Sequence, residues 1–296
     1  MEHRANSETR GRQVKADLHL HTTASDGRLE PAELVRLAVK VGLDVIAITD
    51  HDTINGVPAA LKAAQEYHSI FVIPGVEINT DVPHGEVHIL GYFVDYTDDS
   101  LEAELRRLRT SRRERAQRMI EKLDKLGMRI EWQRVQELAK GGAVCRPHVA
   151  QVLLEKGYVK SEKEAFDKYI GHNAPAYVQR EKLLPTEAVK LVTRAKGLPV
   201  LAHPGDILEL EVLLPKLKEA GLIGIEVYYK DYGPDVIQRL LKIARMHNLI
   251  ATGGTDYHAF GDGLEVMMGG ALAPAESVER LFVLANTGIL AKVKSR

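Results

Sequence analysis

The chain has 296 residues, of which 45% are hydrophobic and 27% charged, a balance ordinary for a globular protein. Its formal net charge of -1 gives no reason to expect nucleic acid or a membrane as a partner through overall charge. The single cysteine, Cys145, excludes an internal disulfide and a cysteine-rich zinc site, and it is typical of a protein of the reducing cytoplasm.

The chain shows no sign of a membrane or secretory segment. No stretch approaches the roughly 20 consecutive apolar residues of a membrane-spanning helix. Residues 1–13 are polar and charged and lack the apolar core of a secretory signal. We expect them to be a disordered leader.

Predicted strands and helices alternate in two parts of the chain. Strands are predicted at 14–21, 44–51, 71–79 and 87–94, with a helix at 31–41. The pattern resumes with strands at 198–203, 224–229 and 249–255 and helices at about 209–220, 234–247 and 276–286. Repeated βα units predict a mostly parallel sheet or barrel, formed by 14–97 and 188–296. The charged, mostly helical residues 98–187 are expected to be inserted between two barrel strands.

Six of the twelve histidines and three acids lie at or just beyond the predicted carboxyl ends of strands. They are His19, His21, Asp26, His51, Glu77, His88, His203, Asp256 and His258. Active sites of α/β barrels form at this end of the sheet. Side chains two residues apart share one face of a strand, so His19 and His21 can grip one metal ion. Imidazoles with carboxylates and no thiolate suit zinc, manganese or iron.

Each motif by itself has a simpler interpretation. His51 could cap the helix that follows, Glu77 could be a salt-bridge partner, and His203 could be a satisfied core histidine. The complete set favours metal, because burying so many polar groups without a shared partner would cost roughly 2 kcal/mol or more each. Asp50 and Asp52, beside His51, either orient ligand imidazoles or cap the following helix, and the sequence leaves both open.

These motifs resemble those of the PHP (polymerase and histidinol phosphatase) family. The resemblance rests on DLHLH at 17–21, SDG at 25–27, TDHD at 49–52, Glu77, HP at 203–204 and GTDYH at 254–258. It covers about 14–95 and 188–270 and implies a distorted (β/α)7 PHP barrel with a trinuclear metal site.

The resemblance also implies how the ligands are shared among two or three divalent ions, Mn²⁺, Zn²⁺ or Fe²⁺. One ion is held by His19, His21, Glu77 and Asp256, a second by Glu77, His88 and His203, and a third by Asp26, His51 and His258. The expected catalytic group is a metal-bridging hydroxide held by Glu77, Asp256 and His203.

The insert is rich in arginine, with seven between positions 106 and 118. The spacing of Leu105, Leu108, Met119, Leu123 and Leu126 predicts one apolar helix stripe, with Arg112 in its middle. Arg112 therefore faces either a substrate phosphate or a local acid in a salt bridge, and both remain open.

Arg146 and His148 flank Pro147 at a predicted helix start, a place that attracts anions. The simpler alternative is that both are ordinary surface residues. The R-x-x-R-A and R-P-H motifs of the insert resemble a PHP subgroup that includes RNase AM and nucleoside 3',5'-bisphosphate phosphatases. Because few free cations are expected in the barrel, we expect the insert to form a substrate lid in which Arg112, Arg146 and His148 hold a second phosphate.

We therefore expect a metal-dependent phosphatase or phosphodiesterase that hydrolyses nucleotide phosphates. The substrate would be a 3',5'-nucleoside bisphosphate, a short 5'-phosphorylated RNA cut by 5'-3' exoribonuclease action, or both, with no DNA duplex and no membrane as partner. A histidinol-phosphatase-like or other small-molecule phosphatase is one alternative. A non-catalytic metal-binding module is another, disfavoured by the full set of nine candidate ligands.

Overall fold

The computed structural model describes residues 13–82, 85–179, 183–261 and 265–285. The expected leader, residues 1–13, lies almost wholly outside them. The strands of the described residues form one seven-stranded sheet in sequence order. They are β1 (Ala16–Leu20), β2 (Val45–Ile48), β3 (Phe71–Val82), β4 (Gly85–Tyr92), β5 (Leu198–Leu201), β6 (Gly224–Tyr229) and β7 (Ile250–Gly254).

The first and last strands lie side by side, so the sheet is a nearly closed barrel. The backbone N–H of His21 donates to the carbonyl of Tyr257 (3.0 Å), and that of Tyr257 donates to the carbonyl of His19 (3.3 Å). Gly254 permits this approach, because a Cβ at that position would lie 2.5 Å from Cβ of His19. The expected distorted (β/α)7 barrel is confirmed.

The barrel is parallel except around β4. The pairs β1–β2, β2–β3, β5–β6 and β6–β7 are parallel, whereas β4 is antiparallel to both β3 and β5. Only two residues separate β3 from β4, which is enough for a hairpin but not for a parallel crossover. The expectation that His88 lies at or just past the carboxyl end of a strand is therefore wrong. His88 lies inside β4, opposite Asn79 of β3.

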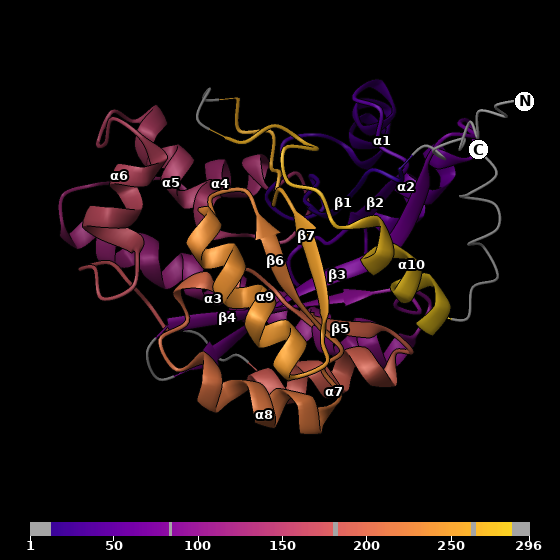
Figure 1. Ribbon diagram of the computed structural model, residues 1–296. Coiled ribbons are helices and arrows are strands. Elements are labelled where there is room, and N and C mark those ends of the chain that lie inside the picture. The colour runs from indigo at the N-terminus through magenta and orange to yellow at the C-terminus, as the bar shows by residue number, and fades with distance from the viewer. Residues whose placement is uncertain (1–12, 83–84, 180–182, 262–264, 286–296) are drawn as a thin grey trace, which may run out of the picture.

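Helices surround the barrel (Figure 1), and residues on their apolar faces are buried in the barrel core. They are α1 (Pro31–Lys40), α2 (Val57–Ala64), α7 (Pro185–Arg194), α8 (Leu210–Ala220), α9 (Pro234–Met246) and α10 (Ala275–Leu284), with a 3-10 turn at Pro204–Asp206. In α9, for example, Leu240, Ile243 and Ala244 lie on one face and are buried. No helix among the described residues is both long enough and apolar enough to cross a membrane.

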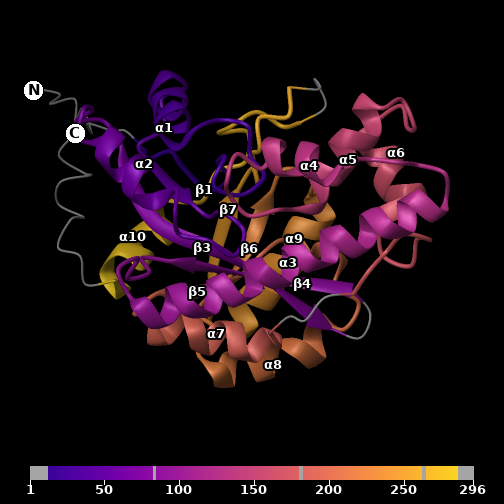
Figure 2. The same cartoon turned by 180° about the vertical axis from the view of Figure 1, so that it is seen from behind.

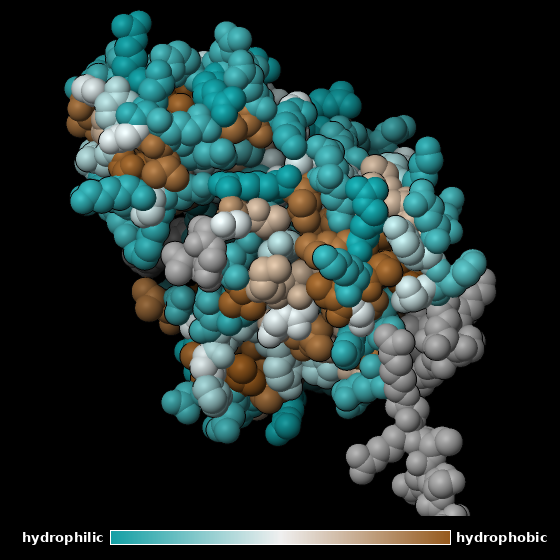
Figure 3. Space-filling view, turned by 90° about the horizontal axis from the view of Figure 1, so that it is seen from above, coloured by the Kyte–Doolittle hydropathy of each residue, from teal (hydrophilic) through white to brown (hydrophobic). Residues whose placement is uncertain are grey.

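A second group of helices lies to one side, between β4 and β5 in sequence. It comprises α3 (Asp99–Lys125), α4 (Trp132–Leu138), α5 (Arg146–Glu155), α6 (Glu162–Ala165) and a π-helix at Phe166–Ile170. The long helix α3 joins both regions (Figure 2). Leu105 and Leu108 pack in the barrel core, whereas Met119 and Leu123 pack in a separate core among α3, α4 and α5. Seen from above, this side of the molecule presents a largely hydrophilic surface (Figure 3).

The predicted apolar stripe of α3 is correct at four positions, which are buried, and wrong at Leu126. The four are Leu105, Leu108, Met119 and Leu123. Leu126 is the C-cap residue, where the helix ends, and it is 47% exposed. Arg112 is buried in the middle of the stripe, as its position in the sequence predicts.

Candidate metal centre

The nine candidate ligands converge at one end of the barrel, although they span positions 19 to 258. Their nitrogen and oxygen atoms fall into three groups, within each of which all atoms lie within 4.8 Å of one another. The groups are His19, His21, Glu77 and Asp256; Glu77, His88 and His203; and His21, Asp26, His51 and His258. Two residues are shared, Glu77 and His21, so the three groups form one continuous cluster.

Glu77 of β3 lies at the centre of the cluster, and its side chain is 1% exposed. Its Oε1 lies 2.8 Å from Nδ1 of His88 and 3.2 Å from Nε2 of His203. Its Oε2 lies 2.9 Å from Nδ1 of His51. A single carboxylate therefore contacts candidate ligands from three other strands or strand ends.

Asp256 closes the cluster on the β7 side. Its Oδ1 lies 3.4 Å from Nε2 of His19 and 3.0 Å from Nε2 of His21. Its other oxygen accepts a hydrogen bond from the Tyr229 hydroxyl (2.9 Å) and contacts Nζ of Lys230 (3.3 Å). The backbone of Asp256 has φ of 49°, a left-handed conformation that costs free energy and is typical of functional sites.

The donor set fits divalent ions. Six buried atoms of the cluster have no hydrogen-bond partner among the described residues: Nε2 of His19, Nδ1 and Nε2 of His21, Oδ1 of Asp26, Nδ1 of His51 and Oε2 of Glu77. An unsatisfied buried polar atom costs about 1–3 kcal/mol, so six at one place indicate that these atoms share a partner such as a metal ion. Imidazole nitrogens and carboxylate oxygens are ligands for Zn²⁺, Mn²⁺ and Fe²⁺.

The electrostatics also call for positive charge. Burial by itself would raise the pKa of Glu77, but the surrounding histidines hold that pKa well below its ordinary value. The pKa of Asp256 is lowered in the same way, by His19 and Lys230 against burial. Burial would lower the pKa of His21, yet Asp256 and Glu77 raise it to about 10. The buried carboxylates thus stay ionised and attract cations.

Two further acids, which the sequence analysis missed, hold the ligands in place. Oε1 of Glu226 on β6 lies 3.1 Å from Nδ1 of His19, and Oε2 accepts the backbone N–H of His203 (2.8 Å). Asp17 accepts the backbone N–H and hydroxyl of Thr255, directly before Asp256. The available signal for Glu226 was an acid inside the otherwise apolar strand GIEVYY.

Asp50 and Asp52 support the centre in ways that the sequence analysis did not predict. Helix capping is wrong, because α2 begins at Val57 and its N-cap residue is Gly56. Asp50 accepts the N–H and hydroxyl of Thr22 and the hydroxyl of Ser25, so it shapes the turn that carries Asp26. Asp52 accepts Nε of Arg112 at 2.7 Å.

A cavity of about 370 Å³ opens at the candidate metal ligands. Its lining includes the candidate ligands Asp26, His51, His88, Asp256 and His258. The segment between β4 and β5 contributes Arg112, Arg115, Cys145, Arg146 and Phe166 to the same lining. Arginines and candidate metal ligands therefore share one space that is large enough for a small ligand.

Arg112 forms the salt bridge that the sequence analysis left open as an alternative to phosphate binding. It is 3% exposed, and its guanidinium donates to Asp52, to Oδ1 of Asn79 and to the Cys145 sulfur (3.2 Å). Asn79 in turn contacts Nε2 of His88 (2.6 Å), so Arg112 is linked to a candidate ligand through one side chain. It nonetheless lines the cavity.

Arg146 and His148 lie in different surroundings. Arg146 lines the main cavity, donates to Glu86 (2.7 Å) and lies over the Phe166 ring. His148 lines a side cavity of about 240 Å³. Its Nδ1 accepts the N–H of Cys145, which leaves Nε2 as the protonated nitrogen. Burial lowers the pKa of His148, so it is a neutral donor rather than a cation.

Lys230 is a cavity-lining cation of the barrel itself, which the sequence analysis missed. Its Nζ contacts the backbone carbonyl of Asp256 (3.1 Å), and its side chain is 16% exposed. Lys230 is paired with Asp256, so it does not contradict the expectation that the barrel holds few free cations. The signal was weak, because Lys230 follows a strand that carries no metal-binding motif.

The chain matches the PHP domain family over residues 17–173. It is 36% identical to the 5'-3' exoribonuclease Rnm of Escherichia coli (strain K12), over 82% of this chain and 84% of that protein. It is 32% identical to the 3',5'-nucleoside bisphosphate phosphatase of Chromobacterium violaceum, over 83% and 88% of the two chains. A crystal structure from Bifidobacterium adolescentis assigned to the metal-dependent phosphoesterases superimposes with a TM-score of 0.85, at 29% identity, over 93% and 97% of the chains.

The barrel and its cluster of histidines and carboxylates are those of a metal-dependent phosphoesterase. The chain belongs to the PHP domain family, and the resemblance stated from its sequence motifs is confirmed. It is accordingly a hydrolase of phosphoric ester bonds.

Proposed function

We propose that the cluster holds two or three divalent ions, Mn²⁺, Zn²⁺ or Fe²⁺, with Glu77 as the bridging ligand. The three groups of ligand atoms and their six unpaired buried atoms support this assignment. Bound there, the ions would neutralise phosphate charge and lower the pKa of a water molecule. The assignment of a hydroxide to Glu77, Asp256 and His203 stays a prediction.

The chain's own residues orient the ligands and bind the substrate. Glu226 accepts the Nδ1 proton of His19, so that Nε2 of His19 faces the cluster with its lone pair. Tyr229 and Lys230 hold Asp256 from the outer side. Lys230 also lines the cavity, where its ammonium group can bind a phosphate oxygen beside the metal ligands.

The proposed substrate carries two phosphate groups, as in a nucleoside 3',5'-bisphosphate or the 5' end of a short RNA. The observation that carries this proposal is that candidate metal ligands and arginines line the same cavity. The scissile phosphate would lie at the candidate metal ligands and the second phosphate at Arg146, whose guanidinium can bind it in place of Glu86. The names of the relatives from E. coli and C. violaceum support nucleotide substrates.

Residues 98–187 would act as the substrate lid in this arrangement. Their helices supply the arginines that line the cavity and have a core of their own. The barrel is joined to them by α3, which packs in both cores. The cytoplasmic location and the absence of a DNA duplex as partner also stay predictions.

A product assay over a substrate panel tests the proposal. The panel contains a nucleoside 3',5'-bisphosphate, singly phosphorylated nucleosides, a short 5'-phosphorylated RNA, histidinol phosphate and a chromogenic phosphate ester, each with added Mn²⁺. The bisphosphate or the RNA should have the highest kcat/KM. Equal kcat/KM for singly and doubly phosphorylated nucleosides would reject the two-phosphate substrate. Preference for histidinol phosphate would favour a small-molecule phosphatase, and no turnover of any substrate a non-catalytic module.

A further inference from the structure

Helix α3 carries a second row of arginines, outside the catalytic cavity. Arg106, Arg109 and Arg113 follow the spacing i, i+3, i+7, which places them along one face of the helix. Arg112 and Arg115 are buried and line the catalytic cavity instead. One helix therefore presents arginines to two separate spaces.

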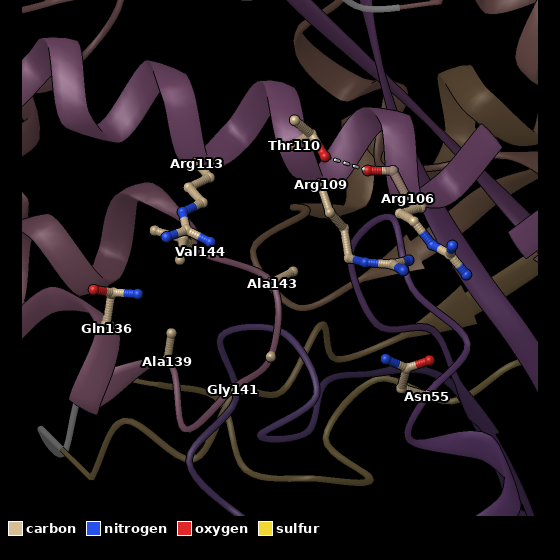
Figure 4. A pocket seen from close by; sticks show the side chains of 11 residues that line it. Asn55, Arg106, Arg109, Thr110, Arg113, Gln136, Ala139, Gly141, Ala143 and Val144 are labelled. Atoms are coloured by element: carbon tan, nitrogen blue, oxygen red, sulfur yellow. Dashed lines mark hydrogen bonds between the residues drawn. The ribbon is translucent and has the colours of Figure 1, made fainter. Parts of the chain in front are cut away.

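The second row lines a groove of about 280 Å³ between α3 and the loop at 139–144 (Figure 4). The side chains of Arg109 and Arg113 extend from α3 toward this loop, with Asn55 and Gln136 at the sides. None of the eleven lining residues is acidic or aromatic. The groove thus offers cationic and neutral polar groups but no ring on which a base could stack.

Part of this positive charge remains available to a ligand. Glu102, which is not a lining residue, pairs with Arg109 at 2.6 Å and with Arg106 at 3.5 Å. Arg106 is nevertheless 71% exposed. Arg113 lies over the Trp132 ring, and within the described residues no carboxylate is paired with it. One glutamate against three arginines leaves the groove positively charged.

The groove is close to the catalytic centre. Leu138 and Lys140 line the side cavity that contains His148, whereas Ala139 and Gly141, on the same loop, line the groove. The side cavity shares Asp26, Pro147, Glu162 and Phe260 with the main cavity. A ligand that extends from the candidate metal ligands through the side cavity therefore reaches the groove by crossing this loop, past the exposed Lys140.

We propose that the groove binds the sugar-phosphate backbone of a single-stranded RNA whose 5' end lies in the catalytic cavity. This inference rests on the proposed function and extends it from nucleotides to longer strands. The arginines are spaced by about 4.5 and 6 Å along the helix axis, so they can contact successive phosphates. With no stacking ring and no base-reading pocket, binding is independent of sequence, and a space of this size accepts one strand but no duplex.

The test compares the double variant Arg106→Gln/Arg113→Gln with Arg118→Gln, which removes an exposed arginine of α3 that does not line the groove. Fluorescence anisotropy measures binding of a 5'-phosphorylated RNA of about twelve nucleotides to the metal-loaded enzyme. The bridging oxygens of its first linkages are replaced by methylene groups to prevent cleavage. The double variant should bind about tenfold more weakly at low salt, and the slope of log K against log salt should fall by about 0.7 for each lost phosphate contact.

Arg118→Gln should bind like the wild type, and Arg113→Lys should retain most of the affinity because it keeps the charge. Hydrolysis of a nucleoside 3',5'-bisphosphate, which is too short to reach the groove, should be unchanged in every variant. Equal RNA affinity and salt slope in the double variant and Arg118→Gln would overturn the proposal. If the wild type binds RNA through the groove but hydrolyses no nucleotide, RNA binding at the groove is supported and the proposed function is rejected.

Discussion

Nδ1 of His19 lies 3.1 Å from Oε1 of Glu226, and both side chains are fully buried. The contact joins β1 to β6 across 207 positions of sequence. Because Glu226 accepts the Nδ1 proton, Nε2 of His19 is left toward Glu77 and Asp256. An acid that contacts no proposed ion thus determines which nitrogen of His19 can bind one.

The substitution Glu226→Gln should lower metal affinity by about 10- to 100-fold, the usual cost of losing such an outer carboxylate. A metal titration followed by elemental analysis measures this, and added metal should restore kcat. Glu276→Gln, at an exposed position of α10, is the matched control. Unchanged metal affinity in Glu226→Gln would show that the contact does not position His19.

Chelation should abolish phosphoesterase activity, and added Mn²⁺ or Zn²⁺ should restore it. The metal-free protein should also unfold at a lower temperature, because the cluster then keeps buried atoms without partners. Elemental analysis and thermal unfolding before and after chelation measure both effects. Full activity in chelator, with less than one transition metal per chain, would contradict the metal centre.

His19→Ala and Asp256→Asn should each lower kcat by at least about 100-fold, since both residues face the same group of ligand atoms. The fold should persist, because the apolar barrel core is separate from the ligands. Circular dichroism checks folding while product release measures kcat. Turnover close to the wild-type value in either variant would remove that residue from the metal centre.

Arg146→Ala should weaken use of a doubly phosphorylated substrate by roughly 2–3 kcal/mol in kcat/KM, the scale of a charge-assisted hydrogen bond. Hydrolysis of a chromogenic ester without a second phosphate should barely change. Arg118→Ala, an exposed arginine outside the cavity, controls for the lost charge. Equal losses on both substrates would place Arg146 at the scissile phosphate or in folding.

Cys145→Ser should retain activity, because no thiolate is needed. Burial raises the pKa of the Cys145 thiol, although Arg112 beside it acts in the opposite direction. The thiol is therefore protonated at neutral pH, and iodoacetamide should react with it slowly in the folded protein. Inactivation of Cys145→Ser with metal content and folding intact would show a chemical role for the sulfur.

Local patterns in the sequence predicted the elements and the candidate ligands. The alternation of βα units is a property of short segments, so the barrel could be inferred from it. His19 and His21 lie two residues apart, and the strand geometry alone places them on one face. His203 and Asp256 each lie two positions past the end of a strand, β5 and β7, where parallel strands of a barrel bring their ends together.

Contacts between distant strands were decided only by the tertiary structure. His88 reaches Glu77 because β4 runs antiparallel to β3. The short connection between the two strands was a local signal against a parallel crossover, but it did not determine their register. Glu226 reaches His19 and Lys230 reaches Asp256 because closure of the barrel brings the end of β1 beside the segment that follows β7, and β7 pairs with β6. Arg112 likewise pairs with Asp52, 60 positions earlier in the chain. The sequence left open whether its partner is a phosphate or an acid. Strand register and barrel closure bring these groups together, and both depend on how the whole chain packs.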